Sequence, residues 1–69
     1  MVNLTDEQLQ TIIECSMDLA IDQLLDGDVE SAKLNALIHR SALKLKNTTA
    51  PLSETELQLV KEFSETLVY

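Results

Sequence analysis

Two residues that interrupt helices, the only glycine and the only proline, divide this chain into three segments. Gly27 ends the first segment, and Pro51 stands between the second and the third. Within each segment the apolar residues recur at spacings of three and four, which is typical of amphipathic helices. The sequence therefore predicts an all-α fold, a compact three-helix bundle with helices at about residues 5–26, 29–46 and 54–68.

The first and third predicted helices share the same start signal. Thr5 with Gln8, and Ser53 with Glu56, have the spacing of a capping box, in which each side chain accepts a hydrogen bond from the backbone N–H of the other residue. Gly27 is the expected left-handed residue after the first helix. The first two helices should therefore form a tight hairpin at Gly27, and the third should return through the linker around Pro51.

The chain has 69 residues, which predicts a single helical domain over residues 1–69. A domain of this size buries only about 60% of its unfolded surface, so it usually needs extra support. One cysteine, Cys15, excludes an internal disulfide, and no cluster of residues has metal-ligand spacing. Self-association is the remaining support, and we expect a symmetric homodimer.

Apolar residues outnumber what one neighbouring helix can cover. The expected inward face of the first helix consists of Leu9, Ile12, Ile13, Ser16, Ala20 and Leu24. The apolar surplus outside that face, with one of the two apolar stripes of the second helix, supplies the predicted dimer interface: Ile21, Leu25, Leu34, Ile38 and Leu45. The second helix, with two apolar stripes, is expected to be the central one. A swap of the third helix onto the partner chain is the alternative.

Acidic residues recur every four positions along the first predicted helix, at Glu14, Asp18, Asp22 and Asp26. On a helix this spacing forms one stripe, called here the acidic stripe, and like charges four residues apart slightly destabilise a helix. Solvent, a basic neighbour or a partner must therefore accommodate it. We assign the four residues as candidate partner-binding residues.

Three interpretations of the acidic stripe stay open. In a hairpin that turns at Gly27, Asp22 would lie beside Lys33. By the same geometry Glu14 would lie beside Arg40, and such ion pairs help to fix the register of a hairpin. The stripe can instead dock a basic protein, since charge complementarity sets specificity and association rate. The third interpretation is imitation of the phosphate backbone of a nucleic acid.

The charge balance narrows the classes of partner. The formal net charge is −7, which disfavours direct binding to nucleic acid or to an anionic membrane. No apolar run approaches the length of a membrane span, and residues 1–8 lack the pattern of a signal peptide. With its single thiol, the chain is expected in the cytoplasm.

The residues that most often carry chemistry do not form a catalytic or metal-binding pattern here. A calcium loop with Gly27 at its sixth position would need an oxygen ligand at Leu24 and a glutamate at Lys33, so it is excluded. His39 has neither a metal-binding pair nor a nucleophile at helical spacing, and we interpret it as a half-buried or interfacial imidazole. Carboxylates near Cys15 make that thiol less reactive.

We therefore expect no enzyme activity, no cofactor and no metal. The sequence favours a small acidic helical protein that acts by binding another protein, as an adaptor or regulator, and that forms a homodimer. The alternative is an acidic inhibitor of the kind made by phages or plasmids, which mimics nucleic acid and blocks a DNA- or RNA-binding protein.

Overall fold

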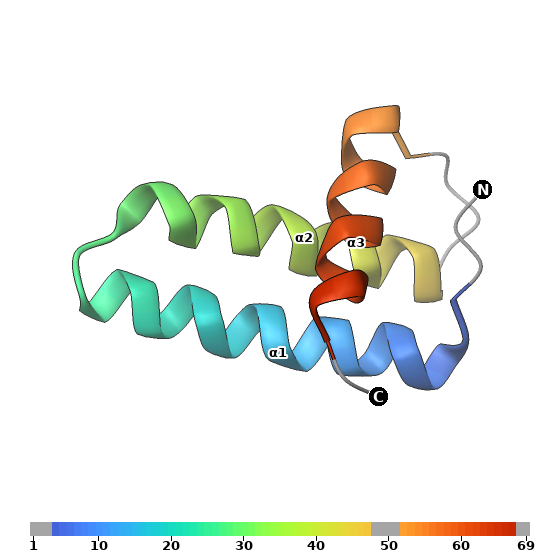
Figure 1. Ribbon diagram of the computed structural model, residues 1–69, viewed down its shortest axis with the longest axis horizontal. Helices are drawn as coiled ribbons and strands as arrows, with labels where there is room; N and C mark the ends of the chain where they lie inside the picture. Colours follow the sequence, from blue (N-terminus) through green and yellow to red (C-terminus); the bar gives the residue numbers. More distant parts are fainter. Residues whose placement is uncertain (1–3, 48–51, 68–69) are drawn as a thin grey trace.

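The computed structural model describes residues 4–47 and 52–67, and that part of the chain is all-helical. Helix α1 spans Asp6–Leu25, α2 spans Val29–Asn47 and α3 spans Glu54–Thr66. In Figure 1, α1 and α2 lie side by side as an antiparallel hairpin, and α3 crosses the hairpin near the end away from its turn. The predicted all-α architecture is confirmed. The predicted linker at Pro51 lies outside the described residues, and α3 ends two residues before the predicted end at residue 68, with Leu67 as its extended C-cap.

The expected start signals account for where α1 and α3 begin. The backbone N–H of Gln8 donates to Thr5 Oγ1 at 3.1 Å, and that of Thr5 donates to Gln8 Oε1 at 3.0 Å. At α3 the N–H of Glu56 donates to Ser53 Oγ at 3.2 Å, and that of Ser53 donates to Glu56 Oε1 at 3.1 Å. Each box satisfies two backbone donors that a helix start leaves unpaired.

Gly27 makes the turn of the hairpin. Its φ is +82°, in the left-handed region that side chains disfavour. The N–H of Asp28 donates to the Gln23 carbonyl at 2.8 Å, and that of Gly27 donates to the Leu24 carbonyl at 3.1 Å. These two bonds form a Schellman motif. Asp28 Oδ1 accepts a hydrogen bond from the backbone N–H of Ser31 at 3.2 Å, so α2 starts directly after the turn.

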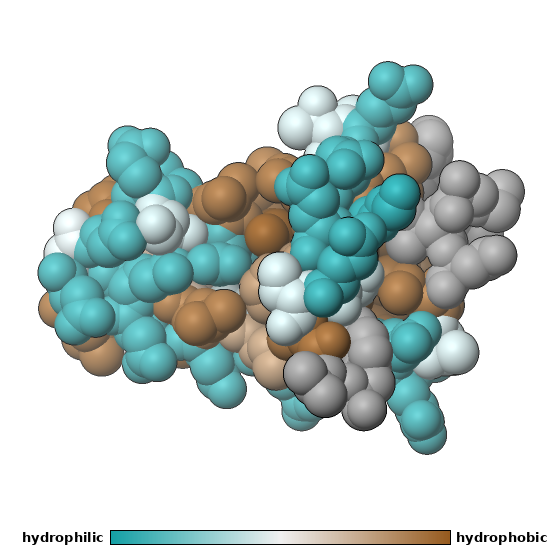
Figure 2. All heavy atoms as spheres, viewed as in Figure 1, coloured by the Kyte–Doolittle hydropathy of each residue, from teal (hydrophilic) through white to brown (hydrophobic). Residues whose placement is uncertain are grey.

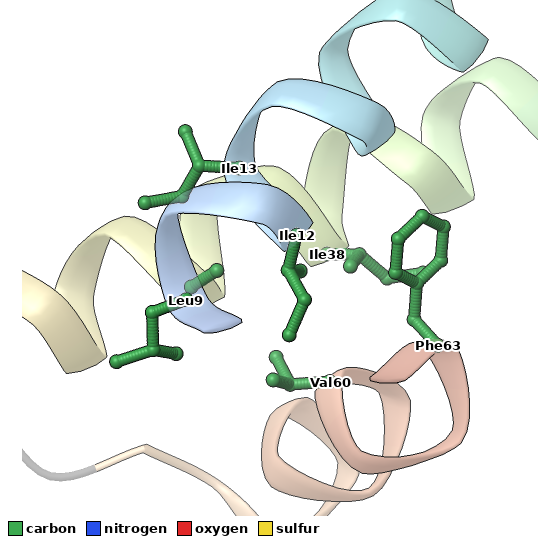
Figure 3. Packing of buried hydrophobic residues seen from close by; sticks show 7 residues of the cluster. Leu9, Ile12, Ile13, Ile38, Val60 and Phe63 are labelled. Atoms are coloured by element: carbon green, nitrogen blue, oxygen red, sulfur yellow. The ribbon is translucent and has the colours of Figure 1, made fainter. Parts of the chain in front are cut away.

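The core lies where α3 crosses the hairpin. Ile12 of α1 and Val60 of α3 are fully buried, and Figure 3 shows them facing one another. Ile38 and Phe63 extend the same cluster, as does Leu9 at its other side. As predicted for the central helix, α2 contacts both α1 and α3. The core is therefore confined to about half the length of the hairpin.

Nearer the turn, small and polar side chains fill the space between α1 and α2. Ala20 and Ala32 are buried there, and Asn35 Nδ2 donates to Gln23 Oε1 at 2.7 Å. Small side chains allow two helices to approach closely, but they bury little apolar surface. The expected inward face is wrong at Leu24, which is 58% exposed because it lies at the edge of the contact between α1 and α2, on the face of the hairpin opposite α3. Residues 17–37, called here the tip half, contain no large buried apolar side chain.

Candidate protein-interaction surface

All the large apolar side chains that are exposed in the described part of the chain lie in the tip half. They are Met17, Leu19, Ile21, Leu24, Leu25, Val29, Leu34 and Leu37, each at least 37% exposed. Exposed apolar residues scattered singly are ordinary, whereas their concentration on one part of a surface marks an interaction site. Leu25 apart, the hairpin divides these residues between its two faces.

One group lies on the same face as α3. Leu19 follows Ile12, which packs on α3, by seven residues, a spacing that returns to the same side of a helix. Leu34 and Leu37 precede Ser41 by seven and four residues, and the Ser41 hydroxyl donates to a glutamate of α3 at 3.3 Å. Figure 2 shows brown groups on both hairpin helices beside α3. We call Leu19, Leu34 and Leu37 the α3-side patch.

A second group lies on the opposite face of the hairpin. Met17, Ile21 and Leu24 share one flank of α1, on the other side of its buried stripe from Leu19. Val29 occupies the matching flank of α2. We call Met17, Ile21, Leu24 and Val29 the far-side patch. Since α3 lies on the other face, this patch faces solvent along the tip half.

A shallow depression of about 290 Å³ continues the far-side patch away from the turn. Its lining residues are Ile13, Glu14, Met17, Asp18 and His39. His39 Nδ1 lies 2.7 Å from the Ile13 carbonyl oxygen, and it must donate the hydrogen because a carbonyl oxygen only accepts. The ring is half-buried, as the sequence indicated, and this contact joins α2 to α1.

The four side chains of the acidic stripe are exposed, and the ion pairs that the first interpretation predicted for Glu14 and Asp22 are not formed. Among residues 4–47 and 52–67, the one ion pair joins Lys44 Nζ to Glu56 Oε2 at 3.7 Å. Asp22 does not pair with Lys33, nor Glu14 with Arg40. The hairpin register is as expected, but the acids lie on the outer edge of α1 and the bases on the outer edge of α2. The width of the hairpin therefore separates them.

Glu56 is the acidic residue with a well-defined environment. The backbone N–H of Ser53 lowers the pKa of the Glu56 carboxyl group, and burial partly opposes this effect. The Ser53 hydroxyl, Lys44 and the Ser41 hydroxyl lower this pKa further. Hydrogen bonds and a cation stabilise the charged form of a carboxyl group. This carboxylate caps α3 and attaches it to α2, so its role is structural.

The residues predicted for the dimer interface differ in their burial. Ile21, Leu25 and Leu34 are exposed, and Leu25 at 81% is the most exposed of the large apolar residues described. Ile38 is instead part of the core, and Leu45 is partly buried against it. These two assignments are corrected because α3 covers the end of the α2 stripe on which they lie. Leu34, nearer the turn on the same stripe, stays uncovered.

Sequence reasoning missed five of the eight as surface residues: Met17, Leu19, Leu24, Val29 and Leu37. One signal for them was present in the chain. The third helix has 13 residues against 20 in the first, or roughly 20 Å against 30 Å at a rise of 1.5 Å per residue. A helix of that length cannot cover the whole hairpin, so some apolar positions had to remain on the surface.

The described residues show neither a metal cluster nor a membrane-spanning helix. They contain no group of three or more His, Cys, Asp or Glu side chains that could hold a metal ion. Over the same two ranges, no helix has both the length and the apolar character needed to cross a membrane. No protein-family model, curated protein or solved structure matches this chain.

Proposed function

We propose that this chain is a non-enzymatic interaction protein that binds another protein through its tip half and acts as a homodimer. The observation that carries the proposal is the separation of the molecule into two halves. One half has a closed core, and the other has small residues inside and eight large apolar residues outside. Burial of such residues against a partner is favourable at about 25 cal/mol per Å².

The α3-side patch is the proposed partner site, and its surroundings favour a partner with basic residues. Asp26 follows Leu19 by seven residues, and Glu30 precedes Leu34 by four, so both carboxylates lie on the patch side of their helices. Both are exposed. An apolar patch with an acidic border fits an amphipathic segment that carries Lys or Arg beside its apolar residues.

Affinity capture with matched variants tests this proposal. The chain is immobilised, binding proteins are captured from lysate, and the capture is repeated with Leu34→Gln and with Leu37→Gln. We expect both substitutions to abolish capture of a specific protein, while Leu25→Gln, the same change at the most exposed leucine, retains it. Asp26→Asn combined with Glu30→Gln, which removes the acidic border of the patch, should weaken capture without affecting folding. Capture that survives all of these changes would refute the proposed site.

A second candidate function is mimicry of nucleic acid, and one observation favours it. The side chains of the acidic stripe, Glu14, Asp18, Asp22 and Asp26, are exposed, and in the described part of the chain none of them forms an ion pair. A nucleic-acid-binding protein captured by the chain and released by added DNA or RNA would support mimicry. Salt-insensitive capture that depends on Leu34 and Leu37 would support the apolar site instead.

A further inference from the structure

The outer edges of the hairpin carry opposite charges. Glu14, Asp18 and Asp22 lie along the outer edge of α1, opposite the side that packs on α2. Lys33 and Arg40 lie along the outer edge of α2 and are exposed. Neither edge can neutralise the other within one chain, since the two helices stand between them.

The two edges are nevertheless in register. Three contacts between α1 and α2 bracket this register: Asn35 with Gln23, Lys46 with Gln10, and His39 with the carbonyl of Ile13. At that register Asp22 is level with Lys33. Glu14 is likewise level with Arg40. The hairpin thus presents two acids on one edge and two bases at matching heights on the other.

The far face of the hairpin is open to a second hairpin. Met17, Ile21, Leu24 and Val29 form an apolar strip there, and α3 lies on the opposite face, so it does not obstruct stacking along the hairpin. Two stacked hairpins would make a four-helix arrangement with the far-side patches in its interior. A symmetric contact of this kind can have its twofold axis along the hairpin or across it.

We propose that a second copy of this chain packs on the far-side patch with the twofold axis along the hairpin. This inference rests on the self-association proposed above and adds the face and the orientation. A rotation about that axis keeps every residue at its height, and it places α1 of each copy against α2 of the other. Glu14 then meets Arg40 of the second copy. Symmetry forms this pair twice.

Electrostatic interactions favour the axis along the hairpin over the axis across it. An axis across the hairpin would place α1 against α1, with one acidic stripe beside the other, and like charges placed together disfavour a complex. The axis along the hairpin turns the same charges into complementary pairs. It also leaves the α3-side patches on the two outer faces, so each dimer would present two partner sites.

A charge-reversal experiment tests the orientation. The monomer–dimer equilibrium is measured by sedimentation equilibrium for the unmodified chain, for Glu14→Arg and for Arg40→Glu. Each variant alone would place like charges together in both symmetry-related pairs, and we expect about a tenfold weaker dimer. An equimolar mixture of the two variants restores opposite charges in both pairs, so its association should return to that of the unmodified chain.

Further variants distinguish a wrong orientation of the dimer from an absence of self-association. Glu65→Arg, a reversal at an exposed position of α3, should leave the dimer unchanged, and Leu24→Gln should weaken it. Circular dichroism checks that each variant folds. If Glu14→Arg strengthens the dimer, or if mixing fails to restore it, the proposed orientation is wrong although self-association stands. An unmodified chain that stays monomeric overturns the self-association itself.

Discussion

Replacement of Leu9 by alanine is the sharpest test of where the core lies. The side chain is 5% exposed, so the substitution removes roughly three methylene equivalents at about 0.8 kcal/mol each and leaves part of a cavity. We expect the free energy of unfolding to fall by about 3 kcal/mol. A domain of 69 residues has a total stability of roughly 3–10 kcal/mol, so this loss is a large fraction of it.

Leu25→Ala is the matched control. That leucine is 81% exposed, so the substitution should lower the free energy of unfolding by only about one fifth of the side chain's transfer free energy, roughly 0.5 kcal/mol. Urea unfolding followed by circular dichroism gives both values. With a slope near 1 kcal/mol per M, the midpoint should shift by about 3 M for Leu9→Ala and by less than about 0.5 M for Leu25→Ala.

Equal shifts for the two leucines would refute the assignment of the core to the α3 end of the hairpin. If Leu9→Ala is already unfolded without urea, a milder change keeps the test quantitative. Ile12→Val removes one methylene from a fully buried side chain and should cost about 1 kcal/mol. Ile21→Val, at a 48% exposed position, is its control and should cost clearly less.

Two further predictions concern a titrating group and the turn. The folded-state pKa of Glu56 is lowered, so its charge stabilises the fold above the unfolded pKa of about 4.3, and this contribution is lost as the pH falls through the folded value. Glu56→Gln can keep the capping box but not the charge, so its urea midpoint should lie below that of the unmodified chain at pH 7 and approach it at about pH 3. Gly27→Ala should cost about 1–2 kcal/mol because φ is +82° while no neighbouring atom lies within 4 Å of an added Cβ. Gly27→Asn should cost less, and equal midpoints for glycine and alanine would contradict the strain argument.

The local features of the fold were predictable because they depend on residues close together in the sequence. Thr5, Ser53 and Gly27 each determine a helix boundary through contacts within a few residues. The register of the hairpin follows from a turn of fixed length. Such features require no knowledge of how distant elements cross.

The tertiary features were predicted less well because they depend on the position of α3. Ile38 and Leu34 belong to one apolar stripe of α2, yet one is in the core and the other is on the surface. Periodicity gives both residues the same face but not the level at which a third helix covers it. The charged residues of α1 and α2 show the same difference. The sequence predicts which acids of α1 are level with which bases of α2, but the edge of the hairpin on which each side chain lies depends on how the two helices pack.

The small residues between the helices near the turn also have a kinetic consequence. Ala20 and Ala32 contribute little burial to oppose separation, so the amides of the tip half should exchange with solvent deuterium by local opening, faster than those around Ile12 and Val60. A ligand of the tip would suppress this opening in proportion to its occupancy. Hydrogen exchange could therefore locate a partner's footprint and report its affinity in one measurement, since the tip would change from the least protected part of the hairpin to a protected one.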